Sequence, residues 1–220
     1  MRHLGSFLLV LGAAATAGCS EIASPRRAAS YEYRVFVSNQ TGGTDTLAFH
    51  WPRSTMPVRI WVASDDPLRE GVLAAIERWE GAFLYGEWRA DLVSDSSRAD
   101  IIVRNVIAPA GPNLSRLESL APQCLGATDI DANRAQRRLT LPIRVYVWPR
   151  FLANDPEMPT CYRLTVTHEI GHAIGIFAHS PNSGDVMFAN PVLDGISERD
   201  RLTAETAYHL APTLEPFGRR

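Results

Sequence analysis

The chain has 220 residues, of which 45% are hydrophobic, and its formal net charge is −2 at pH 7. This length and composition allow one domain of ordinary size with a packed core, and they exclude a disordered chain. The small negative charge excludes the basic footprint that nucleic-acid binding requires, so no nucleic-acid partner is expected.

The first residues are typical of a targeting segment. A short basic start, Met1 to His3, precedes an apolar run from Leu4 to Ala17 that is too short for a comfortable membrane span. Residues 1–18 are therefore predicted to be a signal peptide. The run ends in Thr16-Ala17-Gly18-Cys19, which resembles the lipobox of bacterial lipoproteins, where the chain is cut before a cysteine that is then lipidated. The alternative is an ordinary signal peptide followed by an unrelated cysteine.

Residues 19–50 are expected to form a lipidated tether and an N-terminal segment. Ser20 to Ser30 is small and polar, which is typical of a flexible linker. Tyr31 to Val37 alternates in polarity and predicts a strand outside the catalytic core, and Thr41 to Asp45 predicts a turn.

From Trp51 onward, the hydrophobic pattern predicts strands and helices of a single domain, residues 51–220. Strands are expected at 58–62, 88–93, 101–107, 126–130 and 139–148. Helices are expected from Pro67 to about Phe83, from Thr160 to Ile176, and from Ser197, as N-cap, to Leu210. The stretch 108–122 is rich in Pro and Gly and predicts a loop.

Two cysteines remain when Cys19 is set aside. An even pair in an exported chain makes Cys124 and Cys161 candidates for a disulfide. Two buried free thiols are the alternative, because spacing alone fixes no connectivity.

The stretch from His168 to His179, with the sequence HEIGHAIGIFAH, predicts a catalytic metal site. His168 and His172 are four residues apart, so on a helix they point the same way and can bind one zinc ion. Glu169 would lie beside the metal as a general base rather than as a ligand. A helix that merely carries two histidines on a polar face is the alternative.

A third ligand is expected beyond the helix. Gly175 can adopt the left-handed conformation that ends a helix, and the chain can then return to the metal. His179 is the predicted ligand, and Asp185 is its competitor because carboxylates also bind zinc. The other histidines of the domain, His50 and His209, are expected to be packing or surface residues.

These residues resemble the metzincins, and the matrixin branch in particular, whose pattern is HExxHxxGxxH followed by a Met-turn. The His179-Ser180 pair is similar to the His-Ser pair of matrixins, and Val186-Met187-Phe188 is similar to the Met-turn, although Met187 could also be an ordinary core residue. The resemblance is specific over residues 165–188 and looser from Trp51 to the last helix, including residues 99–102. It does not cover residues 19–50. His179 comes one residue later than the family pattern places it.

The resemblance implies an α+β fold with a twisted, mostly parallel sheet, one antiparallel edge strand and an active-site helix. A small C-terminal part would hold the third ligand, the Met-turn and the last helix. It further implies that Zn²⁺ is bound by His168, His172 and His179, that Glu169 is the catalytic base, and that an extended peptide pairs with the strand at 126–130.

The resulting hypothesis is a monomeric zinc endopeptidase that cleaves proteins or peptides outside the cytoplasm. It would be secreted or held at the bacterial cell envelope, touching the membrane only through the lipid at Cys19. Two other classes remain open. One is a zinc amidase that acts on cell-wall material, and the other is a non-enzymatic lipoprotein that binds a partner at the surface.

Overall fold

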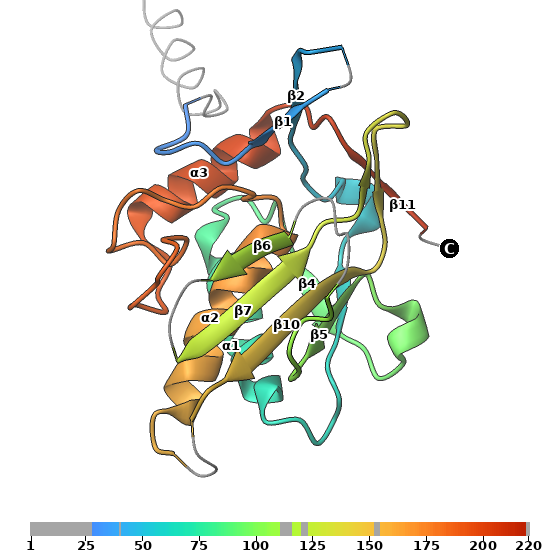
Figure 1. Ribbon diagram of the computed structural model, residues 1–220. Helices are drawn as coiled ribbons and strands as arrows, with labels where there is room; N and C mark the ends of the chain where they lie inside the picture. The colour runs from blue at the N-terminus through green and yellow to red at the C-terminus, as the bar shows by residue number, and fades with distance from the viewer. Residues whose placement is uncertain (1–27, 40, 111–115, 120–122, 152–154, 219–220) are drawn as a thin grey trace, which may run out of the picture.

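The computed structural model describes residues 28–39, 41–110, 116–119, 123–151 and 155–218. The predicted signal peptide and Cys19 lie outside these residues. The described part of the chain forms a mixed α/β fold with three α-helices and a mostly parallel sheet (Figure 1). None of its helices has the length and apolar character that a membrane span requires.

The three helices lie close to their predicted positions: α1 (Leu68–Ala82), α2 (Met158–Ala173) and α3 (Glu198–His209). The Asp66 carboxylate accepts a hydrogen bond from the Leu68 N–H at the start of α1. Ser197 caps α3 in a reciprocal capping box with Asp200.

The central sheet has six strands in the order β4-β3-β5-β10-β7-β6. They are β3 (Val58–Trp61), β4 (Ala90–Leu92), β5 (Ile101–Arg104), β6 (Arg116–Ser119), β7 (Cys124–Asp129) and β10 (Ile143–Pro149). The first four strands in the sheet order pair in parallel, whereas β7 is antiparallel to both β10 and β6. The predicted mostly parallel sheet is therefore confirmed.

The position predicted for the edge strand is wrong. The strand at 126–130 was expected to form the antiparallel edge, but β6 covers its outer side, with Leu117 opposite Thr128. A bidentate ion pair from Arg116 to Asp129, with its shortest N···O distance at 2.7 Å, holds the two strands together. The prolines and glycine of 108–122 predicted a loop, so the four-residue strand β6 within this stretch was not predicted.

A second correction concerns the predicted strand at 139–148, which is two strands in the structure. β9 (Arg138–Thr140) joins β8 (Ala132–Asn133) and β11 (Glu215–Phe217) in a small separate sheet, whereas β10 begins at Ile143. Pro142 lies at the break, where its missing N–H cannot take part in either ladder.

The segment before Trp51 packs on the same core as the helices. The predicted strand at 31–37 is shorter and shifted, as β1 (Val35–Ser38), and it pairs only with β2 (Thr44–Leu47). Tyr31 and Tyr33 precede it and are buried with the apolar residues of α1, α2 and α3. The described part of the predicted tether and N-terminal segment, from residue 28 on, therefore contributes to the common core.

Helix α2 is the buried centre of the fold. It lies with α1 behind the sheet (Figure 1), and its residues from Thr165 to Ala173 are all buried. Two buried indoles bind its backbone: Trp79 Nε1 donates to the Thr167 carbonyl at 2.8 Å and Trp51 Nε1 to the Ala173 carbonyl at 3.0 Å. Because a buried indole N–H needs an acceptor, these bonds help to fix α2 relative to α1 and to the N-terminal segment.

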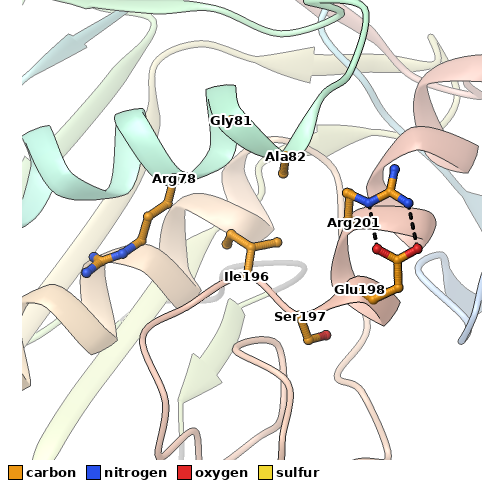
Figure 2. Close-up of a pocket in the computed structure, with 7 residues that line it drawn as sticks. All are labelled: Arg78, Gly81, Ala82, Ile196, Ser197, Glu198 and Arg201. Atoms are coloured by element: carbon orange, nitrogen blue, oxygen red, sulfur yellow. Dashed lines mark hydrogen bonds and ion pairs between the residues drawn. The ribbon is translucent and has the colours of Figure 1, made fainter.

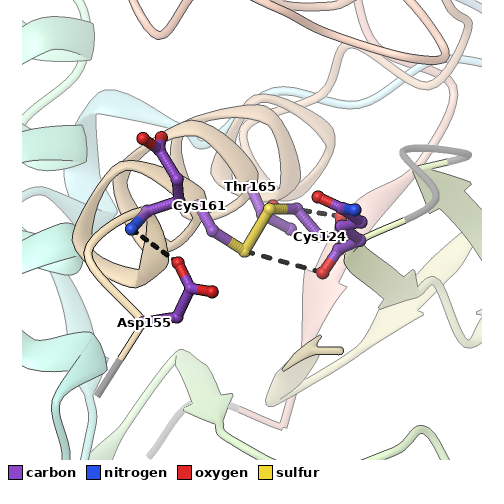
Figure 3. Close-up of a disulfide and its surroundings, with 6 residues drawn as sticks. Cys124, Asp155, Cys161 and Thr165 are labelled. Atoms are coloured by element: carbon purple, nitrogen blue, oxygen red, sulfur yellow. Dashed lines mark hydrogen bonds between the residues drawn. A yellow bond between two sulfur atoms is a disulfide. The ribbon is translucent and has the colours of Figure 1, made fainter. Parts of the chain in front are cut away.

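A disulfide joins Cys124, at the start of β7, to Cys161, near the start of α2, with the two Cα atoms 5.4 Å apart (Figure 3). One turn further along the helix, the Thr165 hydroxyl donates to the Cys124 carbonyl at 3.2 Å. The strand that lies over the helix is thus linked to it covalently and by hydrogen bonding.

We predict that the exported protein contains this disulfide. Without reductant, alkylation followed by peptide mapping should leave Cys124 and Cys161 unmodified, and reduction should expose both. For a bridge between residues 37 apart, the chain-entropy model gives a loss of about 4 kcal/mol in the free energy of unfolding on reduction. Two alkylated thiols in the native exported protein would contradict the prediction.

Candidate metal centre

The three predicted ligands come together at one end of α2. His168 and His172 lie on the buried face of the helix, and His179 reaches them from the following loop. One ligand atom from each side chain lies within 4.8 Å of the other two. The two helical histidines are fully buried, and His179 is half-buried.

Two backbone carbonyls set the orientation of the helical histidines. Nδ1 of His168 lies 2.7 Å from the carbonyl oxygen of Val186, and Nδ1 of His172 lies 2.6 Å from that of Ile176. A carbonyl can only accept, so both Nδ1 atoms carry the proton. Both Nε2 atoms then hold a lone pair, which is the arrangement of a metal-binding histidine.

Too few protons are available to pair every Nε2 lone pair in the three-histidine cluster. Nε2 of His172 lies 3.2 Å from Nε2 of His179. Nε2 of His168 is buried and has no hydrogen-bond partner among the residues that the structure describes. A single proton on His179 could serve one of these lone pairs and would leave the other unsatisfied, which is unfavourable in a buried site. A shared cation would satisfy all of them, so the cluster could hold a metal ion.

Burial keeps the cluster in its metal-binding form. Removal from water lowers the pKa of His168 to about 3 and the pKa of His172 well below its ordinary value, and it also lowers the pKa of His179. All three imidazoles are therefore neutral at pH 7, so protons do not compete with a metal ion.

Gly175 ends the helix in the way the sequence predicted. Its φ is +120°, in the region that favours glycine. A side chain here would also collide with the backbone of Phe49, because an added Cβ would lie 3.0 Å from the Phe49 carbonyl carbon. The turn allows the chain to leave the helix axis and approach the histidine cluster again.

The N-terminal segment holds the longer loop that leads to His179. The backbone N–H groups of Phe177 and Ala178 both donate to the carbonyl oxygen of Tyr33, at 2.7 and 3.2 Å. The extra residue before His179 is thus held by an outside acceptor. Beyond the ligand, the Ser180 N–H donates to the carbonyl oxygen of Met187 at 2.8 Å.

Asp185, the competing ligand, is committed elsewhere. Its carboxylate is buried, accepts hydrogen bonds from the hydroxyls of Ser180 and Ser197, and forms a salt bridge with Arg199 at 2.7 Å. Burial raises the pKa of the Asp185 carboxyl, but the hydrogen bonds from Arg199, Ser180 and Ser197 outweigh it and lower the pKa below its ordinary value. Asp185 therefore anchors the loop after His179 and does not belong to the three-residue cluster.

Met187 lies in the core against α2. It is fully buried, and its sulfur occupies the space that a Cβ on Gly171 would need. The neighbouring Val186 supplies the carbonyl that orients His168, and its N–H donates to the buried carboxylate of Asp200 at 2.9 Å. The segment expected to form the Met-turn is therefore bonded to both α2 and α3.

The Glu169 side chain is fully buried between α2 and β7. Its Oε2 accepts a hydrogen bond from the Thr128 hydroxyl at 2.7 Å. Gly126, two residues earlier on the same strand, leaves room for the carboxylate, because an added Cβ would lie 2.8 Å from Glu169 Cγ.

Several supporting residues were not predicted from the sequence. The contacts of Thr128 and of the Tyr33 carbonyl depend on segments that are distant in sequence. Asp200 had one local signal, the Ser197-x-x-Asp200 capping pattern, but its long-range bond from the Tyr31 hydroxyl at 2.6 Å had none.

The other two histidines of the domain, His50 and His209, make contacts outside the cluster. Nε2 of His209 lies 3.1 Å from the Glu87 carboxylate, and the His50 ring lies 5.1 Å from the Tyr208 ring.

A cavity of about 270 Å³ lies between the end of α1 and the start of α3 (Figure 2), and neither the three clustered histidines nor Glu169 line it. In this cavity Arg201 is paired with Glu198 at 2.6 Å.

Comparisons of the chain with models of protein families and with curated proteins gave no match. The functional argument therefore depends on the donor set, its burial and the residues that orient it.

We predict that His179, and not Asp185, completes the metal site. His179→Ala should lower zinc affinity by more than the roughly 10–100-fold that loss of an outer-shell partner produces, because a ligand itself is removed. Asp185→Ala should affect zinc affinity far less, although the loss of its salt bridge and hydrogen bonds should lower the melting temperature. Competition with a chromogenic chelator measures both affinities. The reverse order would assign the third ligand to Asp185.

Proposed function

We propose that the protein is a zinc-dependent endopeptidase of the metzincin type, similar to the matrixins. The observation that carries the proposal is the convergence of three neutral imidazoles, two of them from α2, where the buried Glu169 directly follows the first. A metal-binding role alone would not require a buried carboxylate beside the ligands.

Zinc is the metal that best suits this donor set. Three imidazole nitrogens with a remaining position for water are typical of catalytic zinc sites. Nitrogens bound to one tetrahedral zinc lie roughly 3.3 Å apart at the usual bond length, and the Nε2 atoms of His172 and His179 are 3.2 Å apart. The Nδ1–H bonds of His168 and His172 to the carbonyl oxygens of Val186 and Ile176 would fix the orientation of these two ligand rings.

The chemistry would be hydrolysis of a peptide bond by water. Bound zinc lowers the pKa of its water toward neutrality and polarises the substrate carbonyl. Glu169 would accept a proton from the attacking water and deliver it to the departing amine. The dry surroundings of α2 would strengthen these electrostatic effects, because its residues from Thr165 to Ala173 are all buried.

An extended peptide substrate would pair with β6 rather than with β7. Both edges of β7 are already paired, with β10 on one side and β6 on the other. Among the residues that the structure describes, the outer edge of β6 is therefore the main-chain edge nearest to β7 that an extended peptide could use. Proteins or peptides outside the cytoplasm remain the proposed substrates.

We predict that Glu169→Gln abolishes most hydrolysis while zinc stays bound. Loss of a general base typically lowers the rate roughly 10²–10⁴-fold, whereas the three ligands are unchanged. Glu157→Gln, the same chemical change at an exposed position just before α2, is the matched control and should keep wild-type activity. The assays are casein and peptide-library digestion together with elemental analysis for zinc.

Three results would count against the proposal. Wild-type turnover by Glu169→Gln would remove the assigned base. Activity on cell-wall amides without activity on peptides would indicate a zinc amidase. A zinc-loaded wild type that cleaves neither would indicate a non-enzymatic binding protein.

We also propose that the protein is exported and anchored at a bacterial envelope through lipid on Cys19, which lies outside the residues that the structure describes. The Cys19→Ser variant should lose labelling by a fatty-acid analogue in growing cells, and Cys124 should not take over the label because it is bonded to Cys161. Release of unlabelled wild-type protein into the medium would show that the lipobox resemblance is misleading.

A further inference from the structure

Thr128 makes a contact that the proposed catalytic roles do not include. Its hydroxyl oxygen lies 2.7 Å from Glu169 Oε2 and 3.1 Å from the Glu169 backbone carbonyl, and both residues are fully buried. A hydroxyl has one proton to donate. It goes to the nearer oxygen, Oε2, because 2.7 Å is the usual distance for an O–H···O hydrogen bond.

The position of Thr128 is well fixed. It pairs with Val145 of β10 on one side and Leu117 of β6 on the other, so its backbone belongs to a continuous sheet. Its β-branched side chain has few rotamers. The hydroxyl therefore reaches the carboxylate from a rigid element rather than from a loop.

The same face of β7 also shapes the space around the carboxylate. Gly126 and Thr128 both face α2, because side chains two residues apart on a strand share a face. A Cβ at Gly126 would overlap Glu169 Oε1, so the absent side chain leaves room for the carboxylate. The glycine provides the volume, and the threonine fixes the position of the group within it.

We propose that Thr128 is a positioning residue that holds the Glu169 carboxylate in the orientation needed for proton transfer. The proposal rests on the proposed peptidase function, and Thr128 acts only through Glu169. A glutamate has several rotatable bonds, so loss of the Thr128 hydrogen bond would leave the carboxylate less restrained and would reduce the time that it spends near the reacting water. Misplacement of a catalytic group by as little as about 1 Å can lower a rate roughly 100-fold.

The test uses three variants of buried threonines. Thr128→Val removes the hydroxyl at nearly constant volume, and Thr128→Ser retains it. Thr165→Val is the matched control, because its hydroxyl donates to the Cys124 carbonyl at 3.2 Å and it too is fully buried between α2 and β7. If Thr128→Val destabilises the fold, Thr128→Ala removes the same hydroxyl without adding volume.

In peptide hydrolysis, Thr128→Val should lower kcat roughly 10–100-fold with little change in KM. Thr128→Ser should restore kcat, and Thr165→Val should leave it near the wild-type value. Zinc content should be equal in all variants. A purely structural role would instead lower the melting temperature of both valine variants without a selective loss of kcat.

A second readout is independent of activity. In metal-free protein labelled with ¹³C at glutamate carboxyl carbons, Glu169→Gln identifies the Glu169 resonance. That resonance should shift in Thr128→Val and stay near its wild-type position in Thr128→Ser and Thr165→Val. An unchanged resonance together with unchanged kcat in Thr128→Val would overturn the proposal. If the wild type cleaves no peptide, the proposed function fails, and an unchanged resonance would still refute the contact on its own.

Discussion

The hydrogen bonds from His168 and His172 to the carbonyls of Val186 and Ile176 are the interactions on which the site depends. They select the tautomer, direct both Nε2 atoms to one point and join α2 to the loop that follows it. Neither bond forms unless that loop turns back on the helix. The Gly175 turn, the packing of Met187 against Gly171 and the placement of Asp200 therefore serve the same geometry. The two Nε2 atoms, which could bind a metal ion, are thus oriented by backbone groups, which can move less than side chains.

The loop that carries His179 is supported from a distant part of the sequence. The carbonyl oxygen of Tyr33 accepts hydrogen bonds from two successive loop residues, and the Tyr31 hydroxyl donates to the buried carboxylate of Asp200. Burial and the nearby carboxylate of Asp200 both raise the pKa of Tyr31, so its hydroxyl remains a donor. A loop with one extra residue has more conformations available, and these contacts restrict it to one of them. The additional loss of conformational entropy is small, because the cost of closing a loop rises only slowly with its length. The N-terminal segment is thus part of the support for the metal centre.

Strand β7 acts on the site from the other side. It is linked to α2 by the Cys124–Cys161 disulfide at one end and by the Thr128 hydroxyl near the other. Its outer edge is paired with β6, and the ion pair between Arg116 and Asp129 joins the two strands. The strand therefore has little freedom to shift relative to the helix. This rigidity favours a carboxylate that stays in one place, which is the condition for efficient proton transfer.

The sequence by itself determined the parts of this protein that depend on local spacing. The i, i+4 histidines, the adjacent glutamate, the helix-ending glycine and the Ser197 cap are all set by short-range backbone geometry, and the three helices follow from them and from apolar periodicity. The mostly parallel sheet was also predicted, but through the resemblance to a family. Only the tertiary structure decided that β6 covers β7, that Asp185 is occupied by Ser180, Ser197 and Arg199, and that Tyr33 and Thr128 reach the site. Each of these contacts joins residues whose side chains or carbonyls have several possible partners, and only the packing of the whole chain selects one.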